Sequence, residues 1–240
     1  MNAAKRMEGR GVSSRGKITG GVLLLVAVAA LGLIAKTSTS TRADIRLDEH
    51  LATLRTPLFT LVAKAATLAA QAEVGLVAAV VVPAVLWLLR RRRDALLTAC
   101  VMVGALAIAF AVKTLVAEHR PPRRLWLIPP DNAMSFPSGH TTVAAAAALL
   151  LGMLVRGGLR PVAMVAGVIF AGVVAIARMY LGVHYLLDVV GGCLAAVSAA
   201  LLVSGFLDLP RIRRGLEDVG TPAAGRHHAG RTSRVDTGPR

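Results

Sequence analysis

The sequence predicts an all-α fold, a polytopic membrane helix bundle of about six transmembrane helices. Hydrophobic residues make up 55% of the 240 residues. They gather in long apolar stretches, and about 20 such residues in a helix suffice to cross a bilayer. Basic residues cluster in short runs beside these stretches, which is the charge pattern of a multi-pass membrane protein. These two patterns predict the fold class.

Six apolar stretches are assigned as membrane spans. They are residues 18–35, 74–89, 95–116, 138–155, 161–177 and 186–207. The first follows a basic segment, and no small-residue cleavage site follows Lys36, so we expect an uncleaved helix rather than a signal peptide. The apolar stretch 57–71 carries Lys64 and is too short to span alone. We expect it to lie at the interface or to lead obliquely into the next span.

The basic runs predict the orientation of the chain in the membrane. With six spans, the N-terminal segment 1–17, the arginine run 90–93, the turn 156–160 and the segment 211–214 all fall on one side. Short cytoplasmic loops are rich in Lys and Arg, so that side is assigned to the cytoplasm. Residues 18–208 then form the membrane domain. The basic, Gly- and Thr-rich segment 209–240 is expected to be a disordered cytoplasmic tail.

The net charge of +15 invites a nucleic-acid interpretation, which the placement of the charges disfavours. Aromatic residues, which single-strand binders use for stacking, are only 4% of the chain. Cys100 and Cys193 lie inside apolar stretches and are interpreted as small apolar residues. The bilayer is the partner that this composition predicts.

The first polar cluster at an outer helix end contains Lys113 and Arg120, which precedes Pro121. Lys113 lies within an apolar stretch, where a charge is costly and usually functional. The seven-residue separation is nearly two helical turns, so a helix continuing past residue 116 would place both cations on one face. The structural alternative is a snorkelling lysine and an interfacial arginine.

The second cluster is Pro137-Ser138-Gly139-His140, at the start of the fourth span. Pro and Ser are ordinary residues at a helix start, which is the structural interpretation. The N–H groups and positive dipole end of such a helix also suit a phosphate. Gly139 lets the backbone approach a ligand closely, and His140 can donate a proton from the first turn. Ser138 and His140 are two residues apart and do not face each other on a helix, which disfavours a Ser–His hydrolase pair.

The third cluster contains Arg178, His184 and Asp188. His184 and Asp188 are four residues apart, so on a helix they are neighbours. A carboxylate beside an imidazole fixes its tautomer and stabilises its charged form. The alternative is a buried structural ion pair. Together the three clusters supply cations, a phosphate-binding helix start and two histidines, which suits phosphoryl transfer to a histidine nucleophile.

With these residues in place, the sequence resembles the type 2 phosphatidic acid phosphatase family, which shares its site with vanadium haloperoxidases. The family pattern is K-x6-R-P, then P-S-G-H, then S-R-x5-H-x3-D. Lys113 with Arg120-Pro121 matches the first element and residues 137–140 match the second. Arg178, His184 and Asp188 match the third, except that Ala177 stands where the family has Ser. The resemblance implies that this change removes a hydroxyl contact to phosphate.

The resemblance also implies a role for each matched residue. His184 would attack phosphorus to form a phosphohistidine, and Asp188 would orient it. His140 would protonate the leaving group and then activate water. The phosphate oxygens would be held by Lys113, Arg120, Ser138, Gly139 and Arg178, with no metal and no cofactor.

A site at the outer face suits a lipid phosphate substrate whose tails stay in the bilayer. The candidates are an isoprenyl diphosphate such as undecaprenyl diphosphate, phosphatidylglycerophosphate and phosphatidic acid. The short chain and its Ala-, Val- and Arg-rich composition suggest a bacterial enzyme, which favours the isoprenyl diphosphate. The alternatives from other classes are an anion or lipid transporter, an inactive scaffold of the same fold, and a haloperoxidase, which the membrane spans disfavour.

Overall fold

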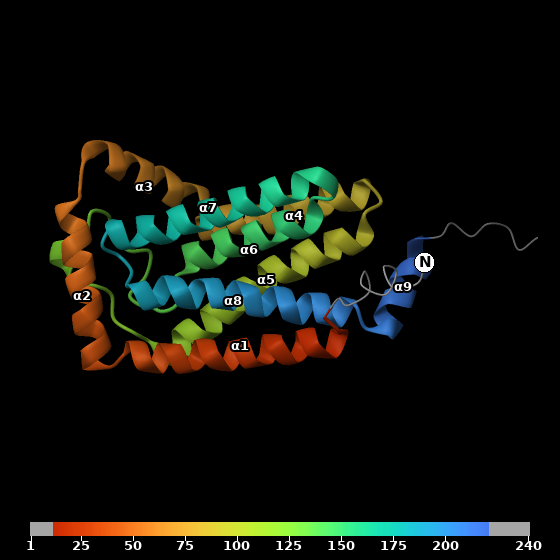
Figure 1. Ribbon diagram of the computed structural model, residues 1–240, viewed down its shortest axis with the longest axis horizontal. Helices are drawn as coiled ribbons and strands as arrows, with labels where there is room; N and C mark the ends of the chain where they lie inside the picture. The colour runs from red at the N-terminus through yellow and green to blue at the C-terminus, as the bar shows by residue number, and fades with distance from the viewer. Residues whose placement is uncertain (1–11, 221–240) are drawn as a thin grey trace, which may run out of the picture.

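The computed structural model describes residues 12–220, and its regular elements are helices (Figure 1). They are α1 (Ser14–Ala35), α2 (Ser38–Thr53), α3 (Pro57–Ala69), α4 (Ala72–Leu88), α5 (Arg92–Val116), the short 3-10 helix η2 (Arg123–Leu125), α6 (Gly139–Leu154), the 3-10 helix η3 (Gly157–Leu159), α7 (Arg160–Tyr180), α8 (Leu186–Leu207) and α9 (Pro210–Gly220). The long helices run side by side as a bundle, α2 crosses one end of it, and α9 lies at the other end. The predicted all-α class is confirmed.

All six predicted spans are helical, but six is slightly more than the number that qualifies as membrane-crossing. Within residues 12–220, four helices, α1, α5, α7 and α8, are long and apolar enough to cross a bilayer. The pair α3 and α4 counts as a fifth span, with a bend of 44° at its break. This agrees with the expectation that 57–71 leads obliquely into the next span. The 16 residues of α6 extend only about 24 Å at 1.5 Å per residue, less than the roughly 30 Å hydrocarbon core.

Small residues allow α1 and α8 to pack closely against each other. A Cβ atom added to Gly21 of α1 would lie 2.6 Å from Cγ of Leu202 on α8, so the two helices approach closely there. Nearby, the hydroxyl of Ser198 donates a hydrogen bond of 2.8 Å to the carbonyl of Gly21. Small residues and interhelical hydrogen bonds of this kind drive helix association in a bilayer, where apolar side chains alone do not.

The segment 37–56, which carries none of the predicted spans, contains the amphipathic helix α2. Its inward face includes Asp44 and Asp48, which are 6% and 1% exposed. Carboxyl groups at these positions interrupt the apolar periodicity that indicates an amphipathic helix in a sequence. Arg55, just after α2, donates hydrogen bonds to the carbonyls of Leu125 (2.6 Å) and Tyr180 (3.0 Å). These bonds tie α2 to the end of α7.

Ion pairs gather at the end of the bundle opposite α2. Asp208, just after α8, contacts Lys17 of α1 at 2.7 Å and Arg93 of α5 at 2.5 Å. The sequence assigns this end to the cytoplasm, and that orientation stays a prediction. The expectation of a disordered tail from 209 is wrong for Pro210–Gly220, which forms α9. Residues 1–11 and 221–240 of the predicted terminal segments lie outside the described residues.

Candidate active site

The helix ends that carry the predicted site residues lie at the α2 end of the bundle (Figure 1). Lys113 lies in the last turn of α5 and His140 in the first turn of α6. Arg178 lies in the last turn of α7, and His184 in the turn that precedes α8. A cavity of about 110 Å³ opens beside Lys113, His140 and His184, and Arg178 does not line it. It is lined by Ala72, Glu73, Lys113, Arg120, Asp131, Asn132, Gly139, His140 and His184.

His184 and Asp188 form a buried pair. Nδ1 of His184 is 3.0 Å from Oδ2 of Asp188, and the two side chains are at most 2% exposed. The pairing was predicted from helical spacing, but His184 precedes the helix, and Asp188 is its third residue in a capping box with Tyr185. The same Oδ2 accepts the Tyr185 N–H at 2.8 Å and the Ser135 hydroxyl. A carboxylate at Nδ1 places the ring proton there and leaves the Nε2 lone pair toward the cavity.

Arg120 lies directly against that lone pair. Its Nη1 is 2.8 Å from Nε2 of His184 and 2.8 Å from the carbonyl of Val183. The sequence predicted that a continuing helix would bring Arg120 beside Lys113. Instead α5 ends at Val116, where Ala117 adopts a left-handed conformation with φ of 48°. The chain therefore turns back over the site, and Arg120 reaches it from an extended segment.

Lys113 and Arg120 also contact the chain segment 131–135, just before the helix α6. The ammonium group of Lys113 donates to the carbonyls of Met134 at 3.0 Å and Ser135 at 2.8 Å. Arg120 donates to the carbonyl of Asn132 at 3.0 Å and to its side-chain oxygen at 3.1 Å. Burial and the nearby charge of Arg178 lower the pKa of Arg120 to about 10, so it stays a cation at neutral pH.

Arg178 and His140 meet at Asp131, a residue that the sequence analysis did not single out. Nη2 of Arg178 is 2.9 Å from Oδ2 of Asp131, and Nδ1 of His140 is 3.7 Å from the same oxygen. The side chain of Arg178 is 0% exposed, and that of Asp131 is 51% exposed. Nε and Nη1 of Arg178 and Nε2 of His140 have no hydrogen-bond partner among the described residues. The available signal was one acidic residue within 120–137, where the other charged residues are arginines.

The helix start contributes through Gly139 more than through Ser138. The hydroxyl of Ser138 caps α6, accepting from the Thr141 hydroxyl at 3.1 Å and from the Thr141 N–H at 3.5 Å. It does not line the cavity, so its predicted contact to phosphate gains no support from this arrangement. Gly139 does line the cavity, and a Cβ atom there would meet nothing within 4 Å. The first backbone turn of α6 is therefore open to a ligand.

Close packing against α8 holds this helix start in place. A Cβ atom on Gly192 would lie 2.7 Å from the carbonyl oxygen of Ser138, and one on Gly191 would lie 2.5 Å from the ring of Phe136. Only glycine leaves room for the segment at both positions. The N–H of Ser138 donates to the carbonyl of Asp188 at 2.9 Å, which links the second and third predicted clusters directly.

A second buried acid, Glu118, lies behind Asp188. Desolvation by burial, with the charge of Asp188, raises the pKa of Glu118 to about 9. Glu118 therefore holds a proton at neutral pH. This residue could not be predicted from the sequence, because one Glu at the end of an apolar stretch is an ordinary interfacial residue.

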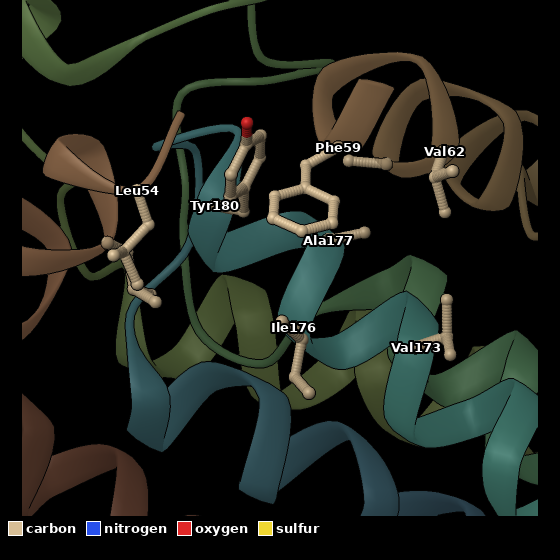
Figure 2. A pocket seen from close by; sticks show the side chains of 9 residues that line it. Leu54, Phe59, Val62, Val173, Ile176, Ala177 and Tyr180 are labelled. Atoms are coloured by element: carbon tan, nitrogen blue, oxygen red, sulfur yellow. The ribbon is translucent and has the colours of Figure 1, made fainter. Parts of the chain in front are cut away.

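Ala177, at the position where the family has Ser, faces away from the cavity. With Tyr180 and Phe59 it lines a separate apolar pocket of about 270 Å³ between α3 and α7, which Leu54 closes on one side (Figure 2). Val173 and Ile176 lie on the same face of α7. A hydroxyl at position 177 would therefore enter this apolar pocket, and the expected loss of a phosphate contact does not follow.

The fold and the site define a multi-pass membrane protein with histidines, arginines and a lysine gathered at one end of a helix bundle. The family model of the PAP2 superfamily matches residues 94–209, which contain every predicted site residue. This match confirms the resemblance to the family that the three motifs predicted.

Two curated relatives place the chain near lipid phosphatases of bacteria. It is 37% identical over 118 residues to the decaprenylphosphoryl-5-phosphoribose phosphatase of Mycobacterium tuberculosis, a match over 48% of this chain and 63% of that protein. It is 37% identical over 83 residues to phosphatidylglycerophosphatase B of Bacillus subtilis, over 32% of this chain and 40% of that protein. The chain thus spans 63% of the length of the mycobacterial relative.

Two solved structures share the fold. The PAP2-type phosphatidylglycerolphosphate phosphatase of Bacillus subtilis superposes with a TM-score of 0.69 at 26% identity, covering 78% of this chain and 94% of that one. Aquifex aeolicus LpxE superposes with a TM-score of 0.54 at 21% identity, covering 68% of this chain and 94% of that one. The second likeness concerns the fold alone.

Proposed function

We propose that this protein is a lipid phosphate phosphatase that works through a phosphohistidine intermediate, without a metal or another cofactor. One observation carries the proposal. Asp188 binds Nδ1 of His184 at 3.0 Å, and Arg120 lies 2.8 Å from Nε2 on the other side of the ring. The imidazole is therefore oriented as a nucleophile, with a cation where the phosphate that it attacks would lie.

In the first step, Nε2 of His184 attacks phosphorus while the bond to the lipid oxygen breaks. The Arg120 guanidinium moves from Nε2 to a phosphate oxygen, and Lys113 and Arg178 offset the charge of the five-coordinate state. His140 gives its proton to the departing oxygen, so a monoester leaves as a neutral alcohol and a lipid diphosphate leaves as the protonated lipid monophosphate. Asp188 stabilises the positive charge that His184 gains.

In the second step, the phosphohistidine is hydrolysed. His140, now neutral, takes a proton from a water molecule as its oxygen attacks phosphorus. The phosphorus–nitrogen bond breaks, inorganic phosphate leaves, and His184 returns to its neutral form. His140 regains the proton that it gave away, so the cycle is balanced with water as the only co-reactant.

A terminal phosphate on a membrane lipid is the substrate class that we propose. The name of the mycobacterial relative indicates a polyprenyl-linked phosphoribose, and that of the Bacillus relative indicates phosphatidylglycerophosphate. Both carry a phosphate monoester on a sugar or polyol at the end of a lipid. We therefore add such monoesters to the isoprenyl diphosphates, such as undecaprenyl diphosphate, and to phosphatidic acid. The positive-inside pattern of basic residues supports an active site at the extracytoplasmic face.

A transporter or an inactive scaffold is the alternative from another class. An anion pathway would place polar residues along several helices, whereas the cations of this site gather at one bundle end. An inactive scaffold would have lost one of the two histidines, and both His140 and His184 are present. These features favour the enzyme.

The test is release of inorganic phosphate by the purified full-length chain in detergent or liposomes. The panel contains isoprenyl diphosphates, a polyprenyl-linked sugar phosphate, phosphatidylglycerophosphate and phosphatidic acid. His184→Ala is expected to abolish release from every substrate. His119→Ala is the matched control, because it removes an exposed histidine from the same end of the bundle. Turnover by His184→Ala near that of the wild type would rule out the mechanism.

A further inference from the structure

Each of the three cations of the site is bound by the protein's own segment 131–135. Lys113 donates to the carbonyls of Met134 and Ser135. Arg120 donates to Asn132 through both its backbone and side-chain oxygens. Arg178 binds the carboxylate of Asp131. Of these acceptors only Asp131 carries a negative charge, so it is the one that resembles a phosphate.

The position of Asp131 is that of an anion which bridges two groups of the proposed mechanism. Its Oδ2 is 2.9 Å from Nη2 of Arg178 and 3.7 Å from Nδ1 of His140, and it lines the same cavity as His184. Its side chain is 51% exposed, whereas that of Arg178 is 0% exposed. The carboxylate therefore comes from the solvent side onto a buried cation, and can leave without unpacking the bundle.

The contact between Asp131 and Arg178 uses only part of the guanidinium. Nη2 binds the carboxylate, while Nε and Nη1 have no partner among the described residues. A guanidinium binds an anion most strongly through two parallel N–H···O bonds. A phosphate, with more oxygens and more charge than a carboxylate, can use the donors that Asp131 leaves unpaired. Asp131 is thus a weaker ligand than a phosphate would be at this guanidinium.

We propose that Asp131 occupies the phosphate position of the site and is displaced when the substrate's phosphate binds. The inference rests on the proposed function, and it adds a residue that sets the affinity for phosphate. An internal group that occupies a binding site lowers the apparent affinity of every external ligand. The apparent affinity is the intrinsic affinity multiplied by the fraction of molecules in which the site is free. Inorganic phosphate lacks the membrane contacts of a lipid tail and so has less binding energy than the substrate. It is therefore the ligand that Asp131 displaces most readily. Asp131 therefore limits inhibition by the product.

The test is competitive inhibition by inorganic phosphate in the Asp131→Asn variant, with Glu49→Gln as the matched control. Asn is close in size to Asp but carries no charge. Glu49 lies at the same end of the bundle in an exposed pair with Arg124, 2.6 Å apart and away from the cavity. Asp131→Asn is expected to tighten the inhibition constant of phosphate by about tenfold, because the charged competitor for Arg178 is gone. An unchanged or weaker inhibition constant overturns the proposal, as does equal tightening by Glu49→Gln.

A second measurement covers the case in which Asp131→Asn does not fold, since the variant leaves Arg178 buried without its counter-charge. Hydrogen exchange of segment 131–135 is measured in the wild-type protein with and without saturating inorganic phosphate. Displacement of Asp131 is expected to speed exchange in this segment, and unchanged or slower exchange contradicts it. The exchange measurement needs no turnover, so its result is independent of the phosphatase assay. Turnover without these effects would leave the proposed function intact and remove the role of Asp131.

Discussion

Nη1 of Arg120 lies 2.8 Å from Nε2 of His184, the atom proposed to attack phosphorus. The Nδ1 side of the ring is held by Asp188, so the contact with Arg120 is made to the free lone pair. The cation therefore covers the nucleophile, and a phosphate oxygen must draw it away before attack. The proposed mechanism therefore gives Arg120 two tasks that can be measured separately, namely to keep His184 neutral and to bind the phosphate.

Replacing Arg120 with Gln is expected to lower kcat/KM by about 10²–10³-fold, the usual effect of losing one donor to a charged transition state. Burial first, and then the charge of Arg120, hold the pKa of His184 well below its ordinary value. Loss of that charge raises this pKa, so more of the histidine is protonated at a given acidic pH. The acid limb of the kcat/KM profile should therefore move to higher pH. A loss of activity with an unmoved acid limb would mean that Arg120 only binds phosphate.

The pair of His184 and Asp188 predicts a second effect. Asp188→Asn is expected to lower kcat by about 10³–10⁴-fold, because the amide can donate to Nδ1 and so favour the tautomer in which Nε2 carries the proton. KM should change little, since Asp188 does not line the cavity. Ser135→Ala serves as the control, because it removes the hydroxyl bond to Asp188 and leaves the carboxylate in place. If the Asp188→Asn variant kept more than about a tenth of the wild-type kcat, the assignment would be contradicted.

The spans could be predicted from the sequence because apolar length is a strong signal in a membrane protein. The expected stretch 95–116 lies within α5, and 186–207 coincides with α8. Helix α2 was missed because two of its inward positions, Asp44 and Asp48, are acidic, and no periodicity argument expects buried carboxyl groups. The number of crossing helices was set too high because α6 is apolar from Val143 to Leu154, yet too short to reach both faces alone.

The site residues were found for reasons that are only partly right. Lys113 and Arg120 do converge, but through a left-handed turn at Ala117 instead of a continued helix. His184 and Asp188 do pair, but from a turn onto a helix N-terminus. Motif spacing predicts which residues come together. It does not predict the backbone geometry that brings them together. Asp131 lies outside the motifs and was missed, because its contact with Arg178 joins residues 47 positions apart.

The buried acids predict that the protein loses stability as pH rises. Burial first, and then neighbouring acids, raise the pKa of Asp48 to about 8 and that of Glu118 to about 9. Both groups are protonated below about pH 4 in the folded and unfolded states, and above that pH the folded state holds protons that the unfolded state releases. Stability is therefore full at acid pH and falls by about 1.4 kcal/mol per pH unit for each group, until the pH passes its folded pKa.

The check is thermal unfolding in detergent between about pH 5 and pH 9, the window that these raised pKa values define. Asp48→Asn and Glu118→Gln remove the titrating groups and should each flatten the fall of Tm with pH. Glu49→Gln, which changes an exposed acid next to Asp48 in the sequence, should leave the slope unchanged. A slope that all three variants share with the wild type would show that neither buried acid holds an extra proton.

The proposed absence of a metal predicts the response to chelators and to vanadate. In the proposed mechanism, Lys113, Arg120 and Arg178 provide the positive charge that a metal would otherwise supply. EDTA is therefore expected to leave phosphate release within about twofold of its starting value, whereas vanadate, which mimics five-coordinate phosphorus, should inhibit competitively. Activity that EDTA abolishes and Mg²⁺ restores would point to a different catalytic mechanism.

Alanine at Gly182, in the turn before His184, is expected to lower the stability of the protein, and alanine at Gly157 provides the comparison. Gly182 has φ of +75°, and a Cβ atom there would overlap the carbonyl oxygen of Leu125. Gly157 has φ of +70° with nothing within 4 Å of the same added atom. Gly157→Ala therefore measures the left-handed backbone alone, at about 1–2 kcal/mol. Gly182→Ala adds a clash with backbone and is expected to cost about 2–5 kcal/mol.

The two variants should also differ in activity, because the clash at position 182 acts on the site. The carbonyl of Leu181 accepts the N–H of Leu127 at 2.9 Å, so the outer loop and the turn before His184 are locked together. Separating them to fit a methyl group moves the nucleophile relative to Arg120, and a displacement of about 1 Å can cost roughly 10²-fold in rate. We expect Gly182→Ala to lower both Tm and kcat, and Gly157→Ala to lower only Tm. Equal losses in both variants would mean that backbone conformation, and not the contact with Leu125, makes glycine necessary before His184.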